Sequence, residues 1–220
     1  MPKNQKITLK NTIHDIVNTL KNDKKDRLSS CIEQNWAKTS LSYSKELNTW
    51  RPDKIIEREL LSAFEKELTR LEIDPANIDQ ILANLNKKRI LQTAPHLGAT
   101  ESPRMLCINW LGSLGVSEKD WYVVGMFSGV PFSNRSRPGR INKEKDSINL
   151  FEGNWQDGLV YRSTITPKLI SAIAEISKSL TKLLPTANLS DSYTKWALQT
   201  CSNIERQILK KKNLIYLDIN

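Results

Sequence analysis

The sequence predicts an α/β protein in which helices cover both faces of a mostly parallel sheet, preceded by an α-helical N-terminal region. Apolar runs typical of strands alternate with helical patterns after residue 88, whereas the first 88 residues are lysine-rich and periodic at helical spacing. All eight glycines lie between Gly98 and Gly158, which assigns the tight turns to the middle of the chain. We therefore expect a helical region over residues 1–88 and an α/β domain over residues 89–220.

The helical region contains two helices with clear starting signals. The first begins with Pro52 and Asp53, residues suited to a first turn, and the second opens at Asp74-Pro75. Weaker patterns predict helices over Ile7–Leu20 and Leu28–Trp36. The first clear helix carries an apolar stripe that we assign to the core, made of Ile55, Ile56, Leu60, Leu61, Phe64, Leu68 and Leu71.

The α/β domain is expected to alternate strands with helices. Pro103 and Pro167 suit the first position of two of the helices, with Ser102 and Thr166 as their N-caps. In chain order we expect a strand over Arg89–Pro95, a helix over Ser102–Gly115, a strand over Asp120–Gly129, a polar loop over Pro131–Asp157, a strand over Gly158–Ile165, helices over Thr166–Leu184 and Ser190–Lys211, and a final strand over Asn213–Asn220.

Composition narrows the class of protein. Hydrophobic residues make up 39% of the chain and charged residues 26%, which is typical of a globular protein. No apolar run is long enough to span a bilayer, and the N-terminus has no apolar signal core, so we expect a cytoplasmic protein without a membrane partner. Three widely spaced cysteines indicate neither a disulfide framework nor a zinc site, and no metal is predicted.

The first candidate site is the segment TAPHLGATESPR, which follows a predicted strand. Ligands of open α/β sheets bind at the carboxyl ends of strands, and the backbone N–H groups at the start of the next helix bind anions. His96 is the candidate catalytic residue. The candidate substrate-binding residues of this segment are Thr93, Gly98, Thr100, Ser102 and Arg104.

The second candidate site is the basic loop FSGVPFSNRSRPGR, which follows the next predicted strand. Its arginines offer paired donors that suit phosphate and carboxylate groups, and its prolines stiffen the loop. Its candidate substrate-binding residues are Ser128, Ser133, Asn134, Arg135, Arg137 and Arg140. A third segment, FEGNWQDGLVY, offers polar groups but precedes its strand, and Asp218 near the last strand end is a candidate for binding ribose or metal.

One short motif resembles a known signature. PHLGAT resembles the HxGH nucleotide-binding signature of class I synthetase-like and nucleotidyltransferase enzymes, with Ala99-Thr100 where that signature has its second histidine. The order of elements from Ile90 to Gly129 also resembles the bacillithiol-type cysteine ligase family, with Thr93 and His96 in comparable places. The resemblance implies a Rossmann-like core that binds ATP, another nucleotide or a phosphorylated substrate.

Three functions stay open at this point. We expect an enzyme, or the nucleotide-binding part of one, that acts on a phosphate-bearing or anionic small molecule in a condensing or group-transfer reaction, as a ligase or transferase does. There His96 would donate a hydrogen bond or a proton, and the arginines would hold the anion. The strand that stops at Asn220 favours a partner subunit or a longer protein, and the net charge of +9 favours a nucleic-acid-binding protein.

Overall fold

A computed structural model gives the structure of two compact units, residues 1–43 and 44–220. Within the first unit, the Lys38 ammonium donates a hydrogen bond to the side-chain oxygen of Asn35 at 2.9 Å. The residues that the structure describes are 38–49, 56–87, 97–98, 103–132, 138–143, 146–151, 158–175 and 182–220, together with Asp15, Asn18 and Asn35.

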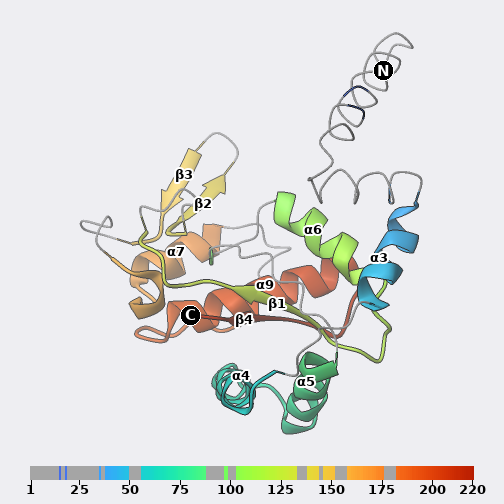
Figure 1. Ribbon diagram of the computed structural model, residues 1–220. Coiled ribbons are helices and arrows are strands. Elements are labelled where there is room, and N and C mark those ends of the chain that lie inside the picture. The colour runs from blue at the N-terminus through green and yellow to red at the C-terminus, as the bar shows by residue number, and fades with distance from the viewer. Residues whose placement is uncertain are drawn as a thin grey trace. The chain divides into compact units, whose positions relative to one another are not determined.

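Helices hold more of the described residues than strands do (Figure 1). None of the described helices is long and apolar enough to cross a membrane. In chain order the elements are α3 (Ser40–Thr49), α4 (Arg58–Arg70), α5 (Pro75–Lys87), α6 (Pro103–Ser113), β1 (Tyr122–Met126), β2 (Arg140–Lys143), β3 (Asp146–Asn149), the 3₁₀ helix η1 (Val160–Arg162), α7 (Pro167–Glu175), α9 (Tyr193–Leu209) and β4 (Leu214–Asp218).

The strands β1 and β4 form a parallel pair that lies in the core of the second unit. Their register runs from Tyr122 opposite Leu214 to Met126 opposite Asp218. All five residues of β1 and the first four of β4 are buried. A parallel pair has cover on both faces, and this explains why both segments are continuous apolar runs. The strands predicted at these two places are confirmed.

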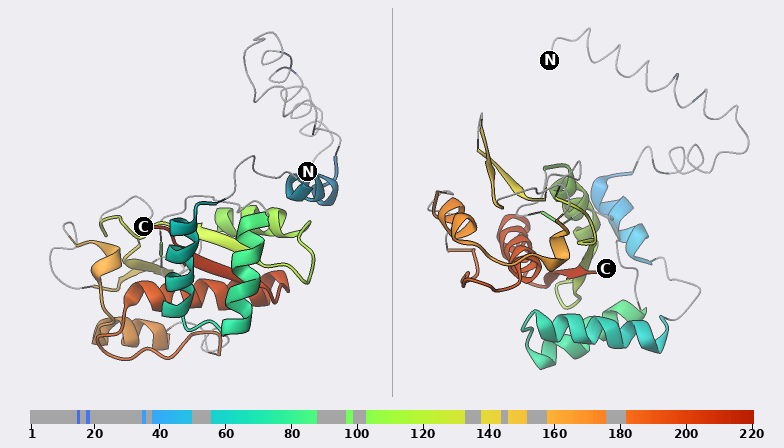
Figure 2. Two further views of the ribbon diagram at one scale, coloured as in Figure 1. Left: turned by 60° about the horizontal axis from the view of Figure 1, so that its bottom comes forward. Right: turned by 90° about the vertical axis from the view of Figure 1, so that its left-hand side faces the viewer.

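Helices cover this pair from more than one side. α9 packs against β4, and α4 packs against both α5 and β4. Figures 1 and 2 show the α4–α5 pair on one side of the strands and α9 on another. Phe64 and Leu68 of α4 are buried, as the predicted apolar stripe requires, whereas Leu60 of the same stripe is 49% exposed.

Three predicted helix starts are confirmed, whereas the helix expected to begin with Pro52-Asp53 begins at Arg58, because Ile56 and Glu57 are not helical and Glu57 is the N-cap. α5 begins at Pro75, and α6 and α7 begin at Pro103 and Pro167. Thr166 caps α7, because its hydroxyl accepts the amide of Leu169 at 3.2 Å. The helix predicted over residues 166–184 is described as far as residue 175.

The predicted fold class is wrong. We expect a mostly parallel Rossmann-like sheet with helices on both faces, but the described residues contain one parallel pair, β1–β4, and a separate antiparallel pair, β2–β3. The segment predicted as a strand over Gly158–Ile165 instead contains the short 3₁₀ helix η1, with isolated β-bridges at Leu159 and Thr164 on either side of it. The amide of Val160 donates to the carbonyl of Val130 at 3.0 Å, so this segment is held by the turn after β1. Its apolar residues mark a buried turn, which a short apolar run does not distinguish from a strand.

The predicted loop over Pro131–Asp157 also differs, because it contains the β2–β3 hairpin. Figure 2 shows this hairpin standing away from β1 and β4. An isolated two-stranded hairpin is marginally stable in water, so its base needs support. Three aromatic rings supply it: Phe151 lies 4.3 Å from Phe132 and 5.0 Å from Tyr193, measured between ring centroids.

Three predicted elements lie outside the described residues. They are the strand over Arg89–Pro95 and the helices over Ile7–Leu20 and Leu28–Trp36, apart from three single helical positions within those helices. These elements therefore stay predictions.

A buried polar cluster joins α6, α9 and β4. The carboxylate of Glu205, whose residue is 1% exposed, accepts the Tyr216 hydroxyl at 2.5 Å and the Asn109 amide at 3.2 Å. Burial raises the pKa of Glu205 above its ordinary value, and the hydrogen bonds from Tyr216 and Asn109 offset part of that rise. Ionised Glu205 is therefore less favourable in the folded protein than in the unfolded chain.

The backbone near Ser44 lies close to the backbone of the turn after α6. Ser44 is fully buried, and its hydroxyl donates to the carbonyl of Gly112 at 3.3 Å and accepts the amide of Gly115 at 2.7 Å. A Cβ atom at Gly115 would stand 2.6 Å from the carbonyl carbon of Ser44. Glycine is required here because two backbones meet without room for a side chain.

The raised pKa of Glu205 predicts how Glu205→Gln changes the pH dependence of stability. A group whose pKa is raised on folding supports the fold at low pH, and this support is lost as the pH rises through the folded-state pKa. Glutamine does not ionise and escapes that loss. We expect the melting temperature of the variant, relative to wild type, to increase from about pH 5 to about pH 8. Glu65→Gln, at an exposed position of α4, is the control. An equal difference at both pH values would contradict the assignment.

The contact at Gly115 predicts that Gly115→Ala destabilises the second unit by about 1–3 kcal/mol, because the new methyl group displaces the backbone of Ser44. Urea unfolding checks this. Gly125→Ala is a milder control, since its methyl group would meet the flexible side chain of Ile219 at 3.2 Å. If the two variants lose equal stability, close backbone packing at Gly115 is not the cause.

Candidate functional site

The carboxyl ends of β1 and β4 lie together and define the place of the candidate site. The amide of Leu97 donates to the carbonyl of Phe127 at 3.0 Å, so the described part of the segment TAPHLGATESPR passes the end of β1. Asp218 closes β4 opposite Met126. In open parallel sheets ligands bind at this edge, and the sequence interpretation's placement of a site here stays a prediction.

Asp218 is held in place by the turn that follows β1. The Ser128 hydroxyl donates a short hydrogen bond to one carboxylate oxygen of Asp218. The other oxygen accepts the amides of Ser128 at 3.3 Å and of Asn220 at 3.2 Å. Ser128 itself is fully buried, so its two hydrogen bonds hold the Asp218 carboxylate in one orientation.

An ion pair on α4 braces the end of β4. Arg70 donates through Nε and Nη2 to the two carboxylate oxygens of Glu67, each at 2.7 Å. One of these oxygens also accepts the amide of Asp218 at 3.3 Å. The pKa of Arg70 is raised, first by its hydrogen bond with Glu67 and further by the charges of Glu67 and Asp218, while burial acts in the opposite direction. The guanidinium is therefore a permanent charge in a fixed orientation.

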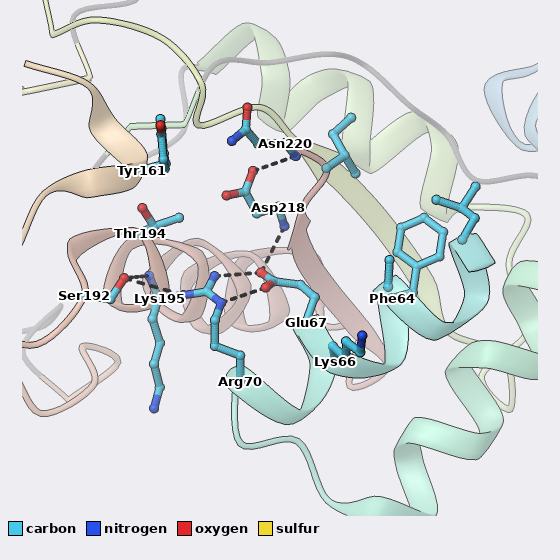
Figure 3. A pocket seen from close by; sticks show the side chains of 13 residues that line it. Phe64, Lys66, Glu67, Arg70, Tyr161, Ser192, Thr194, Lys195, Asp218 and Asn220 are labelled. Atoms are coloured by element: carbon cyan, nitrogen blue, oxygen red, sulfur yellow. Dashed lines mark hydrogen bonds and ion pairs between the residues drawn. The ribbon is translucent and has the colours of Figure 1, made fainter.

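A pocket opens beside this brace, with a volume of about 740 Å³ (Figure 3). That volume is within the range of sites for small organic molecules. Four elements or turns contribute to its walls: α4, η1, the start of α9 and the end of the chain after β4. The described lining residues are Leu60, Ala63, Phe64, Lys66, Glu67, Arg70, Tyr161, Ser192, Thr194, Lys195, Asp218, Ile219 and Asn220.

Polar side chains gather at one end of the pocket, and Phe64 lies toward the other end, where Lys66 is also labelled (Figure 3). Figure 3 shows Tyr161, Thr194 and Ser192 on one side, Phe64 on the opposite side, and the Glu67–Arg70 pair between them. Leu60 and Ala63 belong to the same α4 wall as Phe64. The helical spacing of these residues places them on one face of α4, with apolar groups toward its start and charged groups toward its end.

The start of α9 forms the polar end. Its N-cap Ser192 accepts the amide of Lys195 at 3.3 Å, and the Arg70 Nη1 atom lies 3.5 Å from the same hydroxyl. The amide of Tyr193 donates to the carbonyl of Ser163 at 3.0 Å. Between these two amides, that of Thr194 has no acceptor among the described residues. Free amides at a helix start bind anions.

The predicted site residues are only partly described. Gly98 accepts a weak hydrogen bond from the Cys201 thiol at 3.9 Å, Arg140 begins β2, and Arg104 lies in the first turn of α6. Neither Gly98, Ser128 nor Arg140 is among the described residues that line the pocket. The remaining candidates lie outside the described residues and stay predictions: Thr93, His96, Thr100, Ser102, Ser133, Asn134, Arg135 and Arg137.

The sequence interpretation misses most of the pocket. It places Leu60 and Phe64 in an apolar helix stripe, and among the lining residues only Asp218 and Tyr161, the last residue of FEGNWQDGLVY, belong to its candidate segments. The spacing of Glu67 and Arg70 predicts their ion pair, because residues three apart are neighbours on a helix. Such spacing is common on exposed helices, and it does not indicate that a pocket lies beside the pair.

Comparison with known proteins adds no relative: no family model, no curated protein and no solved structure matches the chain. Among the described residues, no three histidine, cysteine, aspartate or glutamate side chains gather as a metal site requires. We therefore infer the chemistry of the ligand from the geometry and charge of the residues that line the pocket.

The contacts of Glu67 with Arg70 and with the Asp218 amide predict that two glutamate substitutions will have unequal effects on stability. Glu67→Gln weakens both the bidentate pair with Arg70 and the bond to the Asp218 amide, so we expect a loss of about 1–2 kcal/mol in the free energy of unfolding. Glu72→Gln removes a single contact to Lys195 at 2.6 Å from a largely exposed side chain, for which we expect about 0.5 kcal/mol or less. Urea unfolding of both variants is the measurement. Equal losses would show that Glu67 does not brace β4.

Proposed function

We propose that the protein binds a small molecule with an acidic group in the pocket at the carboxyl ends of β1 and β4. The observation that carries this proposal is the meeting of Arg70 with the start of α9 inside a pocket of about 740 Å³. A carboxylate or phosphate placed there receives a fixed guanidinium edge and the amide of Thr194.

The balance of charge around the pocket supports an anion of modest charge. Three cations line it, Lys66, Arg70 and Lys195, against the two carboxylates of Glu67 and Asp218. Two of the cations are paired, Arg70 with Glu67 and Lys195 with Glu72. Pairing orients Arg70 but leaves its Nη1 edge toward Ser192, so one acidic group is better matched than a long polyphosphate.

The chemistry that follows binding stays a prediction. The condensing or group-transfer reaction expected of a ligase or transferase depends on His96, and the use of ATP or another nucleotide depends on the same segment. Asp218 is one of the two carboxylates that line the pocket, and Ser128 fixes its orientation. The roles of interaction subunit and nucleic-acid-binding protein likewise stay predictions, and no described contact favours either.

Ligand binding measured by thermal shift and titration calorimetry tests the proposal. The probes are inorganic phosphate, AMP, ATP, acetate and octanoate. We expect at least one of them to stabilise the wild-type protein, because a ligand that binds only the folded state raises its melting temperature. The double substitution Glu67→Gln with Arg70→Met removes the guanidinium without leaving a lone carboxylate, and we expect it to weaken that binding about tenfold or more.

Lys168→Met is the matched control, since Lys168 is an exposed lysine of α7 that does not line the pocket. Its binding should remain within about twofold of wild type. Two results would count against the proposal: no probe stabilises the well-folded wild-type protein, or the double variant binds the best probe as wild type does.

A further inference from the structure

The wall that α4 gives to the pocket changes character along the helix. Leu60, Ala63 and Phe64 come first, and Glu67 and Arg70 follow at helical spacing. At a rise of 1.5 Å per residue, Leu60 and Arg70 are separated by about 15 Å along the axis. The apolar part of this wall, Leu60 to Phe64, spans about 6 Å of that length and lies at the end away from Arg70.

The size of the pocket exceeds what an acidic group fills. The volume of about 740 Å³ is suited to a molecule of many non-hydrogen atoms rather than to phosphate or acetate alone. Leu60 is 49% exposed although it belongs to the same helix face as buried Phe64. A single exposed leucine is ordinary, but this one lines a pocket that Ala63 and Ile219 also line. Apolar ligand surface placed against this wall leaves water, which is favourable.

We infer that the ligand is an amphiphilic acid, with its acidic group between Arg70 and the start of α9 and an apolar chain or ring along Leu60, Ala63 and Phe64. This inference rests on the proposed function, because Arg70 fixes the acidic end. It adds the direction in which the rest of the ligand lies and its chemical class.

Polar ligands of the same length fit this wall less well. Leu60, Ala63 and Phe64 offer no side-chain hydrogen-bond partner, so hydroxyl groups placed there would lose hydrogen bonds to water without replacement. The polar partners Ser192, Thr194 and Tyr161 stand at the other end of the pocket.

A homologous series of carboxylates tests the inference on the full chain. Acetate, butanoate, hexanoate and octanoate are titrated calorimetrically into wild-type protein. We expect affinity to rise by up to about fourfold for each methylene, the factor that corresponds to about 0.8 kcal/mol of transfer free energy. Leu60→Asn places an amide in the apolar wall. It should reduce the gain in affinity per methylene.

Leu189→Asn is the matched control, because Leu189 is 58% exposed and does not line the pocket. Its series should follow wild type. Affinity that depends on Arg70 but does not rise with chain length overturns the inference and leaves the proposed function standing. A rise with chain length that Leu60→Asn does not reduce places the chain elsewhere and also overturns it. Absence of binding by every carboxylate and phosphate probe overturns both.

Discussion

Five opposed residue pairs join β1 to β4, from Tyr122 beside Leu214 to Met126 beside Asp218. This parallel pairing brings the last residues of the chain against a strand near its middle. Everything at the site depends on it, since the carboxylate of Asp218 meets the Ser128 turn only in this register. A shift by one residue would turn Asp218 to the other face of the pair, away from Ser128, and expose buried apolar side chains.

The pairing alone does not make a pocket, because two strands need helices to cover them. α4 supplies cover and also a fixed polar contact, through Glu67, to the backbone amide of Asp218. The cost of holding Glu67 near the core is offset by the two hydrogen bonds from Arg70. The pocket between α4 and the start of α9 is lined by groups that stabilise the fold, such as Glu67, and by exposed groups, such as Leu60, that do not.

The local elements follow closely from the sequence. Asp74-Pro75, Pro103 and Thr166-Pro167 mark helix starts because they supply caps or need no amide partner. Continuous apolar runs mark β1 and β4, because a strand buried on both faces carries no alternation. The same rule fails at Gly158–Ile165, where the apolar residues are buried in a turn whose amides bond to the loop after β1.

By itself, the sequence determined that helices begin at Pro75, Pro103 and Pro167 and that the apolar runs at β1 and β4 are strands. These are local properties of caps, prolines and apolar runs. The extent of the sheet, the hairpin and the pocket were decided only by tertiary structure. Arg70, Ser192 and Asp218 are far apart in the chain, and no local sequence pattern indicates that they lie together in the fold. Their approach results from the packing of α4 and α9 on β4, which minimises exposed apolar surface over the whole unit.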